Sequence, residues 1–233
     1  MNTNNSTKFF LVLIIIFTCN LGFASFRVGF SSGVDTNIPS RYSGYEYDVN
    51  WEKETGFNGG LTGEFDLTHY LAVKLDAVLV EKRFTRERTS AYTQKYYTAF
   101  NDLYLTLPVC ADFSFGGEQL RGHAYAGLYT GFWLSRNKRG LTFSAGDPAT
   151  YKFSSFDVKE EFNKKRDNRL NAGLTAGFGV SCKVDSSFAV FGESDIFYDL
   201  TSYLRTPEIK KEYRYNTTVR FNIGLMYEIG GAK

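Results

Sequence analysis

The stretch Asn168–Val184, reading NRLNAGLTAGFGVSCKV, alternates between two kinds of side chain. Apolar residues occupy the even positions from Leu170 to Val184, while polar or small residues occupy the odd positions from Arg169 to Lys183. A period of two is typical of a β-strand, whose successive side chains point to opposite faces. The alternation outlasts an ordinary strand of about five or six residues. A tilted strand that crosses a lipid bilayer, at about ten residues per crossing, explains such a length.

The same alternation recurs in residues 25–34, 57–67, 71–82, 100–115, 121–134, 188–200 and 217–229. The connections are alternately long and polar (35–55, 83–99, 136–167, 202–216) and short (67–70, 116–119, 185–187). This rhythm predicts an all-β fold, namely an eight-stranded antiparallel up-and-down transmembrane β-barrel with short periplasmic turns and long extracellular loops. Eight strands leave an interior that side chains just fill, so no open pore is expected. Pro108 predicts a bulge or local break in its strand.

Residues 1–24 are organised like a secretory signal peptide, with Lys8, an apolar run from Phe9 to Phe17, and the small residues Gly22 and Ala24. The run is shorter than the roughly 20 residues of a membrane-spanning helix, so cleavage after Ala24 is expected. A retained anchor and an acylated Cys19 are the alternatives. Residues 25–233 then form one outer-membrane β-barrel domain. Cleavage lowers the formal net charge from +2 to +1, which indicates no nucleic-acid partner.

The charged residues of the strands fall on the parity opposite to the apolar face, so we expect them inside the barrel. Both signs are comparably frequent at each end, which predicts an ion-paired network that fills the lumen. A pathway for protons or ions is the alternative. The predicted network comprises Arg27, Glu64, Asp66, Lys74, Asp76, Lys82, Asp102, Asp112, Arg121, Arg169, Lys183, Glu193, Asp195, Asp199, Arg220 and Glu228.

Closure of a barrel requires that its first and last strands pair antiparallel. Arg27 and Glu228 lie at the same end on the lumen parity, so the expected register brings their guanidinium and carboxylate within pairing distance, directly or one step diagonally. Parity also places Cys110 and Cys182 on opposite faces, so we expect no disulfide between them.

The sequence predicts no enzyme, no cofactor and no metal site. Its two histidines, His69 and His123, both map to the periplasmic side, and no metal-ligand cluster or phosphate-binding glycine loop accompanies them. A soluble, secreted lipocalin-like barrel that binds a small apolar ligand remains the alternative, since parity alone does not say which face points inward.

Contact with an extracellular partner would use the loops. Candidate contact residues there are the tyrosines at 42, 45, 47, 92, 96, 97, 213 and 215, which an aromatic girdle at the membrane interface also explains.

Several segments resemble a known family. They are the charged-interior strand YLAVKLDAVLVEKRF (70–84), the Leu-rich strand NDLYLTLPVCADFSF (101–115), and the glycine-alternating strands YAGLYTGF (125–132) and LTAGFGV (174–180). In these the chain is similar to PorT-like eight-stranded outer-membrane barrels, which share the architecture of OmpX and OmpA. The resemblance implies a place in the outer membrane of a Gram-negative-type envelope, contact with its lipid, biogenesis by the barrel-assembly machinery, and a structural, adhesive or assembly-related role.

Overall fold

The computed structural model describes residues 25–42, 49–89, 95–144, 152–163, 165, 167–202 and 213–229. The expected signal peptide, residues 1–24, lies outside these ranges. Within the described part of the chain, no helix combines the length and hydrophobicity that a membrane span requires. The described ranges form the strands β1 (Phe26–Tyr42), β2 (Val49–Lys53), β3 (Thr55–Asp66), β4 (Leu71–Thr89), β5 (Lys95–Gly116), β6 (Leu120–Ser144), β7 (Lys152–Glu160), β8 (Leu170–Lys183), β9 (Phe188–Asp199) and β10 (Tyr213–Ile229).

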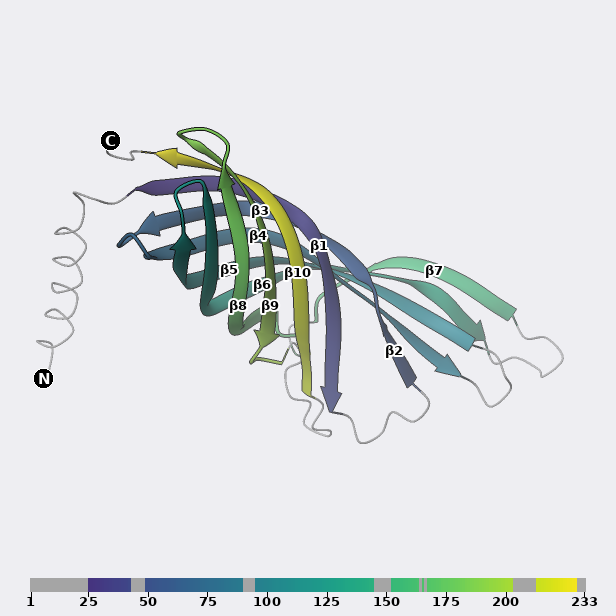
Figure 1. Ribbon diagram of the computed structural model, residues 1–233. Helices are drawn as coiled ribbons and strands as arrows, with labels where there is room; N and C mark the ends of the chain where they lie inside the picture. The colour runs from purple at the N-terminus through teal and green to yellow at the C-terminus, as the bar shows by residue number, and fades with distance from the viewer. Residues whose placement is uncertain are drawn as a thin grey trace, which may run out of the picture.

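Eight strands close into a ring in which each one pairs antiparallel with two neighbours (Figure 1). The order around the ring is β1, β3, β4, β5, β6, β8, β9 and β10, and β10 returns to β1. The remaining two described strands pair outside the ring, β2 with β4 and β7 with β6. The predicted eight-stranded up-and-down barrel is therefore confirmed.

The faces of the strands are also as expected. On β8, Leu174 and Phe178 are 46% and 67% exposed, whereas Thr175 between them is 4% exposed. Charged residues such as Lys74 and Arg220 are buried in the interior. This arrangement is the inverse of a lipocalin-like barrel, whose apolar side chains point inward. Cys110 is buried and Cys182 is exposed, and both are free thiols, as their opposite parities predict.

The closing seam has the predicted register. Phe26 pairs with Ile229 and Arg27 pairs with Glu228, and the pairing continues without a shift along β1 and β10. Pairing of the first and last strands removes the open edges that a sheet cannot have in lipid. At the end of the ring near this pair, the turns are short. Between β5 and β6 the chain reverses at Gly116, whose φ of 112° is accessible to glycine at little cost.

Pro108 interrupts one of its two ladders, as predicted. The pairing of β4 with β5 stops after Leu75 and Val109 and resumes at Val78 and Thr106, while Pro108 still lies opposite Tyr129 of β6. A β-bulge lies elsewhere, where Tyr104 pairs with Trp133 but Leu103 pairs with Ser135. Leu134 is therefore the extra residue of β6, and the parity of β6 reverses beyond it.

The predicted long loops 35–55, 83–99, 136–167 and 202–216 are wrong in part, because some of their backbone is paired strand, including the start of β10 at Tyr213. β1, β4 and β6 continue to Tyr42, Thr89 and Ser144. The apolar alternation ends where the lipid face ends, but polar strands keep pairing beyond it. We call residues 83–89, 95–101 and 135–144, together with β2 and β7, the projecting sheet. It extends away from the ring at the end opposite to the short turns (Figure 1).

Arginine in place of Leu174 should destabilise the barrel by about 2 to 4 kcal/mol in lipid, because a charge on the outer face near mid-bilayer is poorly solvated. The free energy of unfolding in lipid vesicles measures this cost. Glu118→Arg, in the turn after β5, is the matched control and should change stability little. Equal stability of the Leu174→Arg variant and the parent would contradict the assignment of the faces.

Candidate functional site

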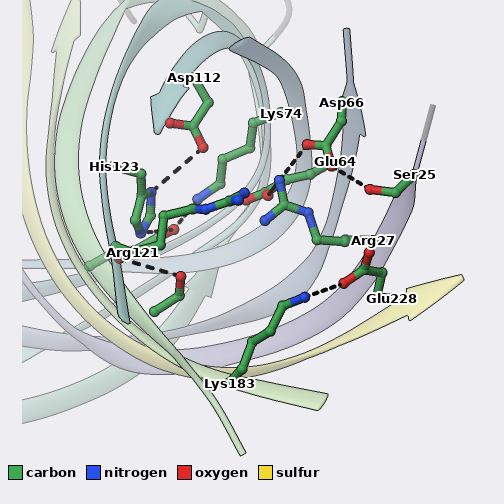
Figure 2. A network of polar contacts seen from close by, with 12 residues as sticks. Ser25, Arg27, Glu64, Asp66, Lys74, Asp112, Arg121, His123, Lys183 and Glu228 are labelled. Carbon is green, nitrogen blue, oxygen red and sulfur yellow. Dashed lines mark hydrogen bonds and ion pairs between the residues drawn. The ribbon is translucent and has the colours of Figure 1, made fainter. Parts of the chain in front are cut away.

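The lumen at the short-turn end begins with a cluster of ionic groups (Figure 2). Arg27 Nη2 lies 3.0 Å from Glu64 Oε2 and 2.5 Å from Asp66 Oδ1, both on β3. Across the ring, Lys183 Nζ lies 3.0 Å from Glu228 Oε2 and ties β8 to β10. The expected ion pair between Arg27 and Glu228 is therefore wrong, although their backbones are paired. The two carboxylates on β3 attract the guanidinium more strongly than the single carboxylate on β10.

The next layer crosses the lumen from β4 to β9. Lys74 Nζ donates to Glu193 Oε1 and lies 4.3 Å from the centre of the Tyr125 ring. His123 stands beside this pair, with Nε2 3.7 Å from Glu193 Oε1 and Nδ1 3.6 Å from Asp112 Oδ2 (Figure 2). Lys74 is 1% exposed. Its charge is thus compensated by a carboxylate and an aromatic face rather than by water.

Above it, Arg220 and Asp195 form a bidentate pair with separations of 2.8 and 2.9 Å. The Tyr125 hydroxyl lies 3.1 Å from Asp195 Oδ2 and 3.3 Å from Glu193 Oε2, which links this layer to the one below. Planar guanidinium and carboxylate groups give the most directional ion pairs available to a protein. Asp76 on β4 pairs in register with Thr62 on β3.

Four donor groups surround the Asp199 carboxylate. The Tyr129 hydroxyl donates to it, and Asn171 Nδ2 and the backbone N–H of Asn216 each lie 3.2 Å from a carboxylate oxygen. Lys82 Nζ lies 3.6 Å away. A carboxylate with several donors is well solvated by the protein itself.

The lumen ends under the projecting sheet in an aromatic layer. Arg136 donates to Asp102 through two hydrogen bonds of 2.6 and 2.5 Å and covers the Trp133 ring at 4.2 Å. Tyr104 stacks parallel to Trp133 with the ring centres 5.9 Å apart.

The short-turn end of the lumen contains free space. A cavity of about 360 Å³ opens there, lined among others by Arg27, Arg121 and Lys183. Deeper, between Glu64, His123 and Glu193, the space shrinks to about 10 Å³, which is about enough for one water molecule. In the described residues, no group of three or more His, Cys, Asp or Glu side chains is arranged to hold a metal ion.

A family model described as an outer membrane protein beta-barrel domain matches residues 19–202. The chain belongs to this family. Its location is accordingly the cell outer membrane, as expected, and its exposed apolar band faces lipid. None of the curated proteins matches the chain in sequence.

Several solved structures are similar to the chain. OprG, an outer membrane protein of Pseudomonas aeruginosa, is similar with a TM-score of 0.51 and 10% identity over 89% of this chain and 96% of OprG. Neisserial surface protein A is similar with a TM-score of 0.47 and 11% identity, over 88% of this chain and 99% of that one. Ail of Yersinia pestis is similar with a TM-score of 0.38 and 14% identity, over 88% of this chain and 99% of Ail. At 10% identity, the similarity to OprG shows the fold alone.

Three predicted lumen residues of this outer-membrane barrel lie outside the lumen or at its margin. Arg169 is exposed, because it precedes β8 and lies beyond the ring. Its Nε donates to the Trp133 carbonyl at 3.0 Å, and its guanidinium covers Phe162. The Lys183 side chain is 44% exposed at the rim. Arg121 is half-buried at the cavity mouth.

Sequence reasoning missed several buried polar groups. The sequence pattern places Arg136 in a loop, but it lies in β6, where the extra residue Leu134 gives it the opposite parity from the one that β6 begins with. Asp35 and Asn37 are 1% and 0% exposed although they follow the expected end of the first strand. Tyr125 and Tyr129 could have been found, because both lie on the polar parity with Arg121 and His123.

Removing one partner of the Arg220–Asp195 pair should lower the free energy of unfolding by about 3 to 5 kcal/mol, because the other charge is left buried without a partner. The two side chains are 3% and 0% exposed. Unfolding of Asp195→Asn, Arg220→Met and the double variant in lipid vesicles measures the coupling. The double variant should lose less free energy of unfolding than the two single variants lose together. Additive losses would mean that the two groups do not act as a pair.

Proposed function

We propose that this outer-membrane barrel conducts nothing and carries the projecting sheet on the cell surface, as a structural or adhesive surface for an extracellular partner. The observation that carries the proposal is the length of β5 and β6, which span 22 and 25 residues. A bilayer crossing uses about ten residues per strand. More than half of each strand is thus available outside the hydrocarbon layer.

The outer face of these strands supports a boundary between lipid and water. Leu105 pairs with Phe132, and both point outward toward lipid. Further along, Asn101 pairs with Asn137, and their neighbours in the same row are Arg83 on β4 and Lys159 on β7. A row of amides and cations suits the headgroup region or bulk water, and not the hydrocarbon.

A lumen closed by its own ion pairs is the second part of the proposal. The layers around Glu193, Asp195, Asp199 and Asp102 occupy successive heights, and each is held by a cation from another strand. An ion that entered would have to break these pairs, which is costly where the groups are buried.

Several finer assignments belong to this proposal. We infer that the barrel is PorT-like, on the motifs at 70–84 and 101–115. The short turns then face the periplasm, residues 1–24 are removed as a signal peptide, and the barrel-assembly machinery inserts the chain. We propose no catalytic role. Contact with the partner would involve Tyr97, which is 43% exposed on the projecting sheet, whereas Tyr45, Tyr47 and Tyr92 lie outside the described residues.

Surface labelling of intact cells tests the orientation. Val158, on β7, is 50% exposed. A Val158→Cys variant, with Cys182→Ser to remove the exposed native thiol, should react with a membrane-impermeant maleimide. The matched variant Ser186→Cys, in the turn between β8 and β9, should react only after the outer membrane is permeabilised. Labelling of Ser186→Cys but not Val158→Cys on intact cells would reverse the orientation.

Planar-bilayer recording tests the closed lumen. The purified natural protein should give no steady conductance, because its buried ion pairs leave no continuous water path. A porin reconstituted in the same bilayer is the positive control. A reproducible ohmic conductance from the natural protein would contradict a lumen closed by ion pairs.

A further inference from the structure

The start of β1 brings Ser25 and three charged side chains together (Figure 2). The Ser25 hydroxyl donates to Asp66, and the Asp66 backbone N–H donates to the Ser25 carbonyl at 3.1 Å. Arg27 lies between Asp66 and Glu64, at 2.5 and 3.0 Å. Ser25 is therefore fixed on β3 by both its backbone and its side chain.

The charges in this cluster do not balance. Glu64 and Asp66 contribute two negative charges, and Arg27 contributes one positive charge. The Glu64 side chain is 3% exposed and that of Asp66 is 21% exposed, so water screens them only in part. Lys183, on the same rim, is 3.0 Å from Glu228 and compensates that carboxylate. Arg121 lies at the same cavity mouth, but among the described residues Arg27 is the cation within 4.0 Å of Glu64 and Asp66. At close range the two carboxylates therefore share one positive charge, which is unfavourable at a partly buried site.

We propose that the missing cation is the α-ammonium group of Ser25, which is created when the Ala24–Ser25 bond is hydrolysed and which then pairs with Asp66. This inference rests on the proposed removal of residues 1–24. Hydrolysis adds one water across the bond, so that Ala24 leaves with the carboxylate and Ser25 keeps the nitrogen as an ammonium. In the precursor the same nitrogen is an uncharged amide.

Processing then completes the rim of the barrel. The Ser25 nitrogen belongs to the residue whose hydroxyl already contacts Asp66, so the new charge arises beside its partner. β1 pairs with both β3 and β10. An ion pair that fixes Ser25, directly before β1, therefore stabilises the pairing of β1 on both sides. Removal of the leader is thereby coupled to the stability of the closing seam.

N-terminal sequencing and intact mass of the protein purified from outer membranes test the first step. The chain should begin at Ser25. A different first residue would overturn the proposal, and an uncleaved chain would overturn the signal-peptide assignment as well. A chain that begins at Ser25 supports the cleavage, and the next measurement then tests the ion pair with Asp66. Failure of the cleavage and failure of the ion pair are thus distinguishable.

The pH dependence of heat unfolding tests the pairing. The midpoint of the shift in gel mobility on heating should fall as the pH rises from about 7 to about 9.5, across the range in which an α-amino group loses its proton. The sign follows because only the ammonium pairs with Asp66, so the stabilisation is present at the lower pH and lost at the higher. The charged or titratable groups around Ser25 are Asp66, Glu64, Arg27, Glu228, Lys183, Arg121, Glu118 and His69.

Asp66→Asn should lower the midpoint at pH 7 by about 2 to 4 °C, the shift expected for about 1 kcal/mol in a chain of this size, and should remove the fall with pH. Glu118→Gln, which changes the same charge at the same cavity mouth, should retain the fall. A full pH dependence in Asp66→Asn would overturn the pairing.

Acetylation of the α-amino group gives a second measurement on the natural sequence, independent of whether Asp66→Asn folds. The reaction on purified, folded protein at about pH 6.5 favours the α-amine over lysine, which holds its proton to higher pH. The acetylated protein should show the lowered midpoint and no fall with pH. An unchanged midpoint after complete acetylation would overturn the proposal.

Discussion

The structure depends on one constraint, which is that no backbone polar group can remain unpaired against lipid. A ring of eight antiparallel strands meets it only if β1 and β10 pair along their length, and they do so from Phe26 with Ile229 onward. The side chains follow from this closure. Apolar residues of one parity face lipid, and everything polar is forced into an interior too narrow for bulk water.

That interior explains why the lumen charges are paired in layers. A buried charge without a partner is far more costly than a buried pair. Some ion pairs cross the lumen, as Lys74 of β4 and Glu193 of β9 do, whereas Asp195 and Arg220 join the paired neighbours β9 and β10. Arg27 shows that the choice of partner is electrostatic as well as geometric. Its backbone lies between Glu228 and Glu64, and its side chain turns to the strand that offers two carboxylates.

The ring, its register and its faces could be predicted because the alternation of residues is long and the apolar set is nearly free of charge. Two features could not. The bulge at Leu134 has no signal in the sequence, and it alone gives Arg136 its inward direction. The sequence predicts loops where the projecting sheet lies, because strands with water on both faces lose the apolar alternation from which strands are recognised. For the lumen residues, parity predicts which face of the sheet a side chain occupies. Which ion-pair partner each side chain has can be read only from the structure.

Hydrogen exchange of the backbone amides in lipid nanodiscs tests the closed barrel most directly. Amides of residues 26–34 and 221–227, on the two sides of the closing seam, should exchange as slowly as those of residues 173–182 in β8, since all of these segments are paired on both edges. Fast exchange confined to the seam, with β8 protected, would mean that β1 and β10 are open edges and would contradict the account.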